Sequence, residues 1–202
     1  MKTSLRIPLQ VSPEQAARLQ ALQKAFAEVC NALAPLVQQT RIWNRVTLHH
    51  MAYKSLRERF PAVGSQMICN AIYSVSRTAR AVFQEPASPF NVQKLQGKPL
   101  PLMRFADNSP VYFDRHTLSL RGQEMSLYTL DGRMRFRASA AALAQLDFHD
   151  RKLTEIALAR GAGGQFELTF RFAPGEAEQT LPPRSKPQRR GAFPEYVQVE
   201  QA

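Results

Sequence analysis

The sequence predicts an α+β fold in which a helical bundle is inserted after the first strand of a small β-barrel. Apolar residues recur at helical spacing between residues 12 and 85, and at the alternating spacing of strands between residues 103 and 172. One alternating strand, residues 4–11, comes before the helices. This order is explained if residues 4–11 join the later strands, because a closed barrel removes the exposed edges of a lone sheet. Barrels of this size and oligonucleotide-binding type commonly bind nucleic acid.

The first strand and the first helix are predicted from local signals. Pro8 indicates that the strand lies at a sheet edge or carries a bulge. Ser12 is a good N-cap for the following helix, and Gln15 can complete a capping box with it. The helix should bury apolar residues at helical spacing: Leu19, Leu22, Phe26, Val29, Cys30 and Leu33. Pro35 should kink or end this helix, with residues 36–43 continuing or restarting it.

Two further helices are expected before the strands. The second runs from Val46 to Phe60 and stops at Pro61. Its apolar stripe is Leu48, Met51, Ala52 and Leu56, and it also carries Tyr53 and Lys54. The third, residues 65–83, is capped by Ser65 and turns Ile68, Ala71, Ile72, Val75, Ala79 and Val82 inward.

The other face of the third helix shows polar residues backed by two arginines: Gln66, Asn70, Tyr73, Ser74, Arg77 and Arg80. Amide side chains can pair with adenine edges and arginines can grip phosphates, so this face is a candidate for reading DNA. A helix face that is merely solvated would have the same composition.

Residues 111–137 are predicted to form a continuous meander of four short strands with one apolar face. The breaks fall at residues 114–116, at residues 121–123 and at Asp131-Gly132, a strong hairpin signal. The second face is basic, with aromatic residues among the arginines: Arg115, Arg121, Arg133, Arg135, Arg137, Tyr112 and Tyr128. Such a surface is typical of a platform that follows phosphates, although exposed arginines can also serve solubility alone.

The rest of the chain divides into a connector, two strands and a tail. We expect residues 86–102 to be a linker and residues 139–146 a short helix. Strands at 152–160 and 165–172 should be joined by the Gly161–Gly164 turn. Residues 173–202 contain prolines and charges without a sustained period and are expected to be a disordered basic tail. The predicted barrel therefore combines residues 1–11 with 103–172.

The composition favours a polyanionic partner. The chain of 202 residues has a formal net charge of +11 and a pI near 10.3, and cations placed on phosphates release counterions. Cys30 and Cys69 fall in helical apolar patterns and are expected to be buried thiols of a reducing compartment. No apolar run reaches membrane-spanning length, so a soluble, cytoplasmic protein without a membrane partner is expected, with no metal site or cofactor.

Five phrases of the sequence resemble one known family, in the family's order and spacing. They are Leu5–Gln15, Tyr53–Pro61, Ser65–Ile72, Val111–Leu120 and Leu127–Arg133. Together they resemble the N-terminal half of the TnpB proteins, RNA-guided nucleases of insertion sequences related to the type V CRISPR effectors. The resemblance covers about residues 4–172. It implies a wedge domain of the oligonucleotide-binding barrel type with an inserted recognition domain, which holds guide RNA and reads a short motif beside the DNA target.

The resemblance ends where the family's RuvC nuclease and zinc module would begin. We expect no strand in residues 173–202 to carry an Asp at its end, and we expect the Glu residues there to lack a structured context: Glu176, Glu178, Glu195 and Glu200. A two-metal site needs rigidly held carboxylates. We therefore expect a module that binds structured guide-like RNA and DNA but is no enzyme by itself, with a separate RuvC-type nuclease chain as a conceivable partner. Alternatives are a protein-interaction subunit of a larger split effector and a decayed transposon fragment. The expected nucleic-acid-binding residues are Tyr53, Lys54, Gln66, Asn70, Tyr73, Ser74, Arg77, Arg80, Arg115, Arg121, Arg133 and Arg135.

Overall fold

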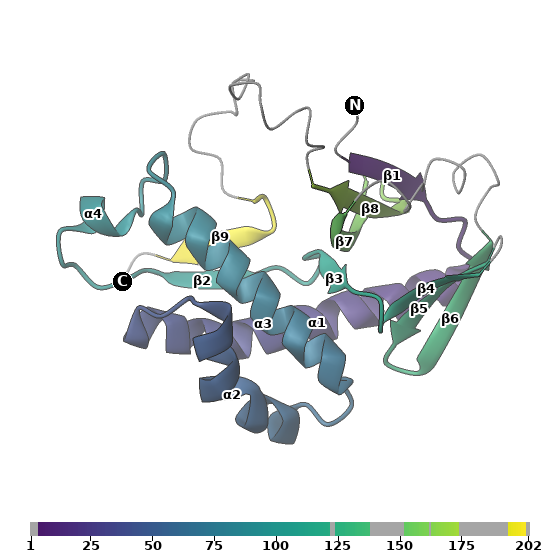
Figure 1. Ribbon diagram of the computed structural model, residues 1–202, viewed down its shortest axis with the longest axis horizontal. Helices are drawn as coiled ribbons and strands as arrows, with labels where there is room; N and C mark the ends of the chain where they lie inside the picture. The colour runs from purple at the N-terminus through teal and green to yellow at the C-terminus, as the bar shows by residue number, and fades with distance from the viewer. Residues whose placement is uncertain (1–3, 122–123, 138–151, 162, 174–193, 201–202) are drawn as a thin grey trace. The chain divides into compact units, whose positions relative to one another are not determined.

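The computed structural model describes residues 4–121, 124–137, 152–161, 163–173 and 194–200, and it is a mixed α+β structure (Figure 1). The chain divides into two compact units. Unit 1 comprises Met1–Gln20 and Pro110–Gln188, and unit 2 comprises Ala21–Ser109 and Arg189–Ala202.

The first sheet of unit 1 joins the first strand to strands far along the sequence. Its order is β1-β8-β7-β3, with β1 (Ser4–Pro8), β8 (Phe166–Phe172), β7 (Leu153–Arg160) and β3 (Val111–Phe113), all neighbours being antiparallel. Ile7 lies opposite Leu168 and both are buried. The prediction that the first strand belongs with the later strands is confirmed. Pro8 lies on the edge strand of this sheet, as its missing N–H requires.

A second sheet of unit 1 follows directly in the chain. It consists of β4 (Leu118–Arg121), β5 (Glu124–Thr129) and β6 (Gly132–Arg137), paired antiparallel in that order. The four strands predicted in residues 111–137 are all present, but β3 pairs with β7 and not with β4. The expected continuous meander is therefore wrong. Among the described residues, the strands of the chain form three separate antiparallel sheets and no closed barrel.

The hairpin between β5 and β6 turns at Leu130 and Asp131, with Thr129 opposite Gly132. The Asp131-Gly132 hairpin signal depends on a type I′ turn, which needs positive φ at both of its central residues. Gly132 has φ of 87°, whereas Asp131 does not have a positive φ. Glycine alone supplies the left-handed conformation here, because it has no Cβ to clash.

Helix α1 (Pro13–Thr40) begins as predicted with a capping box. The Gln15 N–H donates to Ser12 Oγ at 3.2 Å, and the Ser12 N–H donates to Gln15 Oε1 at 3.0 Å. The predicted inward residues are all buried. Pro35 does not end the helix, because buried Leu33 and Val37 hold the helix in the core on both sides of the proline.

The next two helices are α2 (Arg45–Arg59) and α3 (Ser65–Ala79), and α3 continues into the short π-helix η1 (Arg80–Gln84). Two details differ from expectation. Met51 was placed in the buried stripe of α2 but is 44% exposed. Ser65 is the first residue of α3 and not its cap, since the N-cap position is Gly64. Asn44 caps α2, accepting from Val46 N and Thr47 N at 3.0 and 3.1 Å.

Helix α3 packs on α1 through Cys30. The Cys30 thiol donates to the Ala71 carbonyl at 3.8 Å, and burial raises the pKa of Cys30 to about 12 against the opposing hydrogen bond from Ser74. The prediction of a buried thiol is confirmed for Cys30, whereas Cys69 is half-exposed.

The expected linker, residues 86–102, is a folded part of unit 2. It contains α4 (Val92–Leu95), and Asn91 Nδ2 donates to the carbonyls of Gln84 and Glu85 at 3.0 and 3.1 Å. Ser88, Asn91 and Leu100 are buried. The prolines of this segment thus shape compact turns and do not mark an extended connection.

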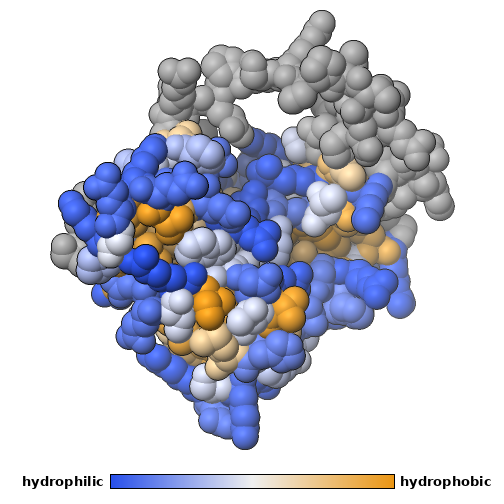
Figure 2. Space-filling model, turned by 60° about the vertical axis from the view of Figure 1, so that its left-hand side comes forward, coloured by the Kyte–Doolittle hydropathy of each residue, from blue (hydrophilic) through white to orange (hydrophobic). Residues whose placement is uncertain are grey.

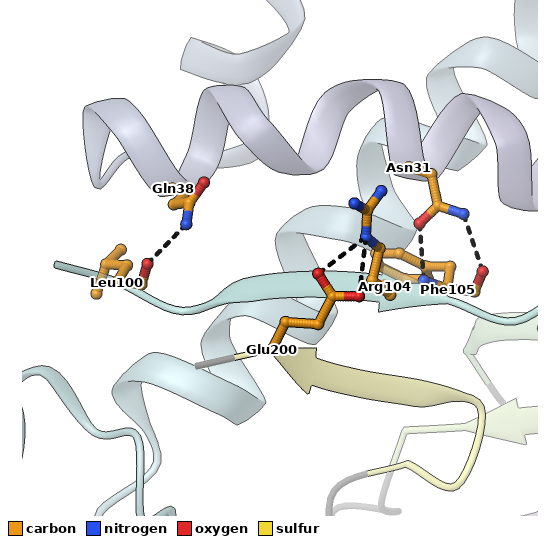
Figure 3. Close-up of polar contacts among 6 residues, drawn as sticks. All are labelled: Asn31, Gln38, Leu100, Arg104, Phe105 and Glu200. Atoms are coloured by element: carbon orange, nitrogen blue, oxygen red, sulfur yellow. Dashed lines mark hydrogen bonds and ion pairs between the residues drawn. The ribbon is translucent and has the colours of Figure 1, made fainter. Parts of the chain in front are cut away.

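The predicted disordered tail contains a strand, β9 (Val197–Glu200), which pairs antiparallel with β2 (Leu102–Phe105). We expected Glu200 to lack a structured context, but its carboxylate lies 3.3 Å from Arg104 Nε (Figure 3). The alternation of Val197 and Val199 spans too few residues to mark a strand in the sequence alone. Residues 174–193 of that tail, and the helix expected at 139–146, lie outside the described residues.

The other edge of β2 is covered by amide side chains of α1 (Figure 3). Asn31 Nδ2 donates to the Phe105 carbonyl at 2.9 Å, and Asn31 Oδ1 accepts from the Phe105 N–H at 2.8 Å. Gln38 Nε2 donates to the Leu100 carbonyl at 3.0 Å. Asn31 therefore does for β2 what a neighbouring strand would do.

Candidate nucleic-acid interface

The three-stranded sheet β4–β5–β6 separates apolar and basic side chains by strand alternation. Leu118, Met125, Leu127, Met134 and Phe136 are buried on its inner face. The outer face, here called the arginine face, consists of Ser119, Arg121, Glu124, Ser126, Tyr128, Arg133, Arg135 and Arg137. The period of two along each strand produces this division.

The strand register places the arginines of β6 beside small and aromatic residues of β5. Arg133 lies opposite Tyr128 and Arg135 opposite Ser126. Arg133, Arg135 and Arg137 are exposed, as are Arg121 and Tyr128. Glu124 is the single acidic residue of the arginine face, so the face carries a net positive charge.

Arg133 is oriented by the sheet itself. Its Nη2 donates to the His116 carbonyl at 2.8 Å, and its Nη1 lies 3.4 Å from the hydroxyls of both Ser119 and Ser126. These contacts hold the guanidinium along the surface while it stays exposed. A preordered guanidinium loses less conformational freedom when it binds a phosphate.

The one acidic residue neutralises little of this charge. Glu124 Oε2 lies 3.8 Å from Arg135 Nη1, with side chains 55% and 76% exposed. Exposed pairs of this kind contribute about 0–1 kcal/mol, and they are screened by salt. Arg135 can therefore exchange the carboxylate for a phosphate at small cost.

The first turns of α1 support the sheet from the side of β6, within unit 1. Gln15 Nε2 donates to the Arg135 carbonyl at 3.2 Å. Arg18 Nη2 donates to Thr129 Oγ1 at 3.1 Å and to the Asp131 carbonyl at 3.3 Å, and its Nε lies 3.7 Å from the Asp131 carboxylate. Arg18 thus stabilises the turn between β5 and β6, the strand that carries Arg133, Arg135 and Arg137.

Arg115 lies at the turn between β3 and β4. Asp114 Oδ1 accepts from the N–H groups of His116 and Thr117 at 3.0 and 3.1 Å, which closes an Asx-type turn. Arg115 is exposed on it. Tyr112, which we placed among the exposed arginines, is 5% exposed. That part of the prediction is wrong, because β3 belongs to the β1-β8-β7-β3 sheet, whose packing buries its residues.

The predicted reading face of α3 does not exist as a set. Asn70 and Ser74 are buried, at 5% and 1% exposure. Ser74 hydrogen-bonds the Cys30 side chain in the core. Gln66, Tyr73 and Arg77 are half-exposed and Arg80 is exposed. The amide pair proposed to read adenine is thus divided between the core and the surface.

Tyr53 and Lys54 lie on α2 of unit 2. Lys54 is exposed, and Tyr53 is half-exposed with its ring stacked on that of His49 at 4.7 Å. Arg45, at the start of α2, has its guanidinium 5.3 Å from the centroid of the Tyr73 ring.

Arg137 belongs to the arginine face, although we did not include it among the expected binding residues. The signal was present, because Arg133, Arg135 and Arg137 are spaced by two and share a strand face. Ser119 and Ser126 gave no such signal. Their role depends on the pairing of β4 with β5, which brings both hydroxyls to Arg133.

Hydrophilic residues predominate on the side of the molecule shown in Figure 2, where hydrophobic residues form small separate areas. Among the described residues, the exposed large hydrophobic side chains are Val46, Met51 and Tyr128. In the same part of the chain, no three His, Cys, Asp or Glu residues form a group that could hold a metal ion. None of the described helices has both the length and the apolar character needed to span a bilayer.

Comparison with known proteins finds no protein-family model and no curated protein that matches this sequence.

Proposed function

We propose that the chain is a non-catalytic nucleic-acid-binding module that holds structured RNA, with DNA, through the arginine face. The observation that carries this proposal is the row Arg133, Arg135 and Arg137 on one exposed side of β6. Residues spaced by two on a strand are roughly 6.8 Å apart. This spacing allows neighbouring guanidiniums to contact neighbouring phosphates of one extended strand.

The surroundings of the row support a nucleic-acid ligand. Tyr128 is 37% exposed opposite Arg133, so a π-face is available beside the cations. Ser119 and Ser126 add hydroxyls that can donate to phosphate oxygens. The net charge of +11 supplies a long-range attraction for the same polyanion.

The proposal extends to the role that the TnpB resemblance implies. Unit 1 would correspond to the wedge domain, related to an oligonucleotide-binding barrel, and the helices of unit 2 to the recognition domain. Pairing of β1 with β8 supports this proposal, because in the sequence the helices are then inserted between two strands of one sheet. In this role the module would work beside a separate nuclease chain.

The test compares two triple variants of equal charge. Arg133→Ala, Arg135→Ala and Arg137→Ala are combined in one protein. The control combines Arg6→Ala, Arg104→Ala and Arg171→Ala, three arginines that are also exposed and that pair with acidic residues. Both proteins lose three positive charges, so a difference between them reports position and not net charge.

Binding is measured by fluorescence anisotropy with a labelled RNA hairpin that carries a polyuridine tail, and circular dichroism checks folding. An exposed ion pair between an arginine and an RNA phosphate contributes about 0.5–1 kcal/mol. Losing three such pairs predicts a loss of about tenfold to hundredfold in affinity for the arginine-face variant. The control variant should lose clearly less. Equal losses in both variants would show that the arginine face is not the binding surface.

A further inference from the structure

Helix α2 carries a second, exposed stripe beside its buried one. Leu48, Ala52 and Leu56 are buried at intervals of four. A different set, here called the ring stripe, recurs at intervals of three and four over the helix: Val46, His49, His50, Tyr53, Lys54 and Arg57. Residues at this spacing share one side of a helix. Such periodicity usually marks a contact surface, yet this stripe is aromatic and basic instead of aliphatic.

The rings of the stripe already contact one another. His49 and Tyr53 are stacked, with centroids 4.7 Å apart and planes 18° from parallel. His50 meets His49 edge-on at 5.9 Å and 89°. His50 is exposed, and the two stacked rings are half-exposed. Three adjoining rings thus form one cluster that is partly exposed to solvent.

The charge around these rings is positive. Lys54 is exposed next to Tyr53, and Arg57 is positioned by donating to the Val63 carbonyl. The acidic residue of α2 is Glu58, which lies about 100° around the helix from Arg57. The ring stripe itself contains no carboxylate. Val46, 63% exposed, adds apolar surface at the start of the stripe.

We propose that the ring stripe of α2 binds unpaired nucleotides, with a base on the His49–Tyr53 stack and phosphates at Lys54 and Arg57. Aromatic rings next to cations are the chemistry that holds single strands without sequence preference. A bilayer surface would instead favour a broad aliphatic face, which the ring stripe lacks. The inference takes its ligand class from the proposed function, but it concerns a different surface in unit 2.

The test measures two probes on each variant: labelled polyuridine RNA and a fully paired RNA duplex of the same length. His49→Ala and Tyr53→Ala should each weaken binding of the single strand about fivefold to hundredfold, which corresponds to about 1–3 kcal/mol for a stacked base. Binding of the duplex should stay unchanged, because its bases are already stacked. Tyr53→Phe keeps the ring and should retain the affinity. Met51→Ala is the matched control, an exposed residue of α2 outside the stripe.

Each outcome decides the inference. Unchanged single-strand affinity in both alanine variants, or equal losses for strand and duplex, would overturn it while the arginine face could still bind. A second outcome is that the alanine variants of the ring stripe lose affinity while the triple variant lacking Arg133, Arg135 and Arg137 keeps the affinity of the wild type. In that case the inference stands and the proposed arginine-face site is wrong. A wild-type protein that binds neither probe would refute both.

Discussion

Replacing Asn31 with alanine tests how the edge of β2 is held. The Asn31 amide forms two hydrogen bonds with the backbone of Phe105, at 2.9 and 2.8 Å (Figure 3). The Phe105 side chain is buried at 3% exposure, in a strand whose other edge pairs with β9. Alanine is a good helix former, so α1 itself should persist.

The magnitude follows from the two backbone groups left behind. Each unsatisfied buried donor or acceptor costs about 1–3 kcal/mol. Asn31 is half-exposed, so water can reach part of the space that the amide leaves. We therefore expect the local stability of the β2 edge to fall by about 2–3 kcal/mol, near the low end of the sum for the two groups. Gln38→Ala removes only one hydrogen bond, to the Leu100 carbonyl, and should cost about 1 kcal/mol.

The assay is hydrogen exchange of the Phe105 amide by NMR, since two units need not unfold together and a single unfolding midpoint can mislead. The Phe105 N–H donates to Asn31 Oδ1. Asn31→Ala should therefore speed its exchange by about thirtyfold or more, the equivalent of 2 kcal/mol. The Gln38→Ala control should leave it almost unchanged. Equal exchange rates in the wild type and Asn31→Ala would refute the strand-like role of Asn31.

Four further outcomes follow from three residues. Burial raises the pKa of Cys30 to about 12, so iodoacetamide at pH 8 should label Cys69 before Cys30, and mass spectrometry showing equal labelling would contradict this. Because that pKa lies above the ordinary 9.0, the contribution of Cys30 to stability is complete below pH 9 and falls as the pH rises towards 12. Gly132→Ala should lower the free energy of unfolding in urea by about 1–2 kcal/mol, because φ at this position is 87°. The added Cβ would meet no atom within 4 Å, so the loss would come from the backbone alone, and an unchanged midpoint would exclude backbone strain. Asn70→Ala should lower stability by about 1–3 kcal/mol without changing DNA sequence preference, and an altered preference in a fully stable variant would restore the reading face of α3.

Local signals in the sequence predicted the elements well. The Ser12–Gln15 capping box, the inward residues of α1 and the alternation of β5 and β6 depend on neighbours within a few residues, and the structure confirms all three. The position of β1 was also predictable, because a lone strand before three helices needs distant partners.

Pairing between distant strands was harder to predict from the sequence. Alternation predicts that β3 and β4 are strands, but it does not say that β3 joins β7 while β4 joins β5. Four residues, Val197–Glu200, give too short a period to distinguish from a tail. Their partner β2 and the amide of Asn31 become evident only in three dimensions.

For the candidate interface too, local features were predictable from the sequence and long-range contacts were not. The arginines of β6 follow from alternation, whereas the orientation of Arg133 depends on hydroxyls of two other strands. On α3, polar character was an unreliable guide to exposure. Ser74 is polar but buried, because the Cys30 side chain on α1 provides its hydrogen-bond partner.

The central claim is tested most directly by the salt dependence of RNA binding in the wild type and in the variant lacking Arg133, Arg135 and Arg137. For a single strand, the logarithm of the affinity falls with the logarithm of salt by roughly 0.7 for each phosphate contact. If these three arginines each contact a phosphate, the slope of the variant should be shallower by about 2 than that of the wild type. Identical slopes, or a wild-type affinity that does not change with salt, would contradict the proposal that the arginine face binds nucleic acid.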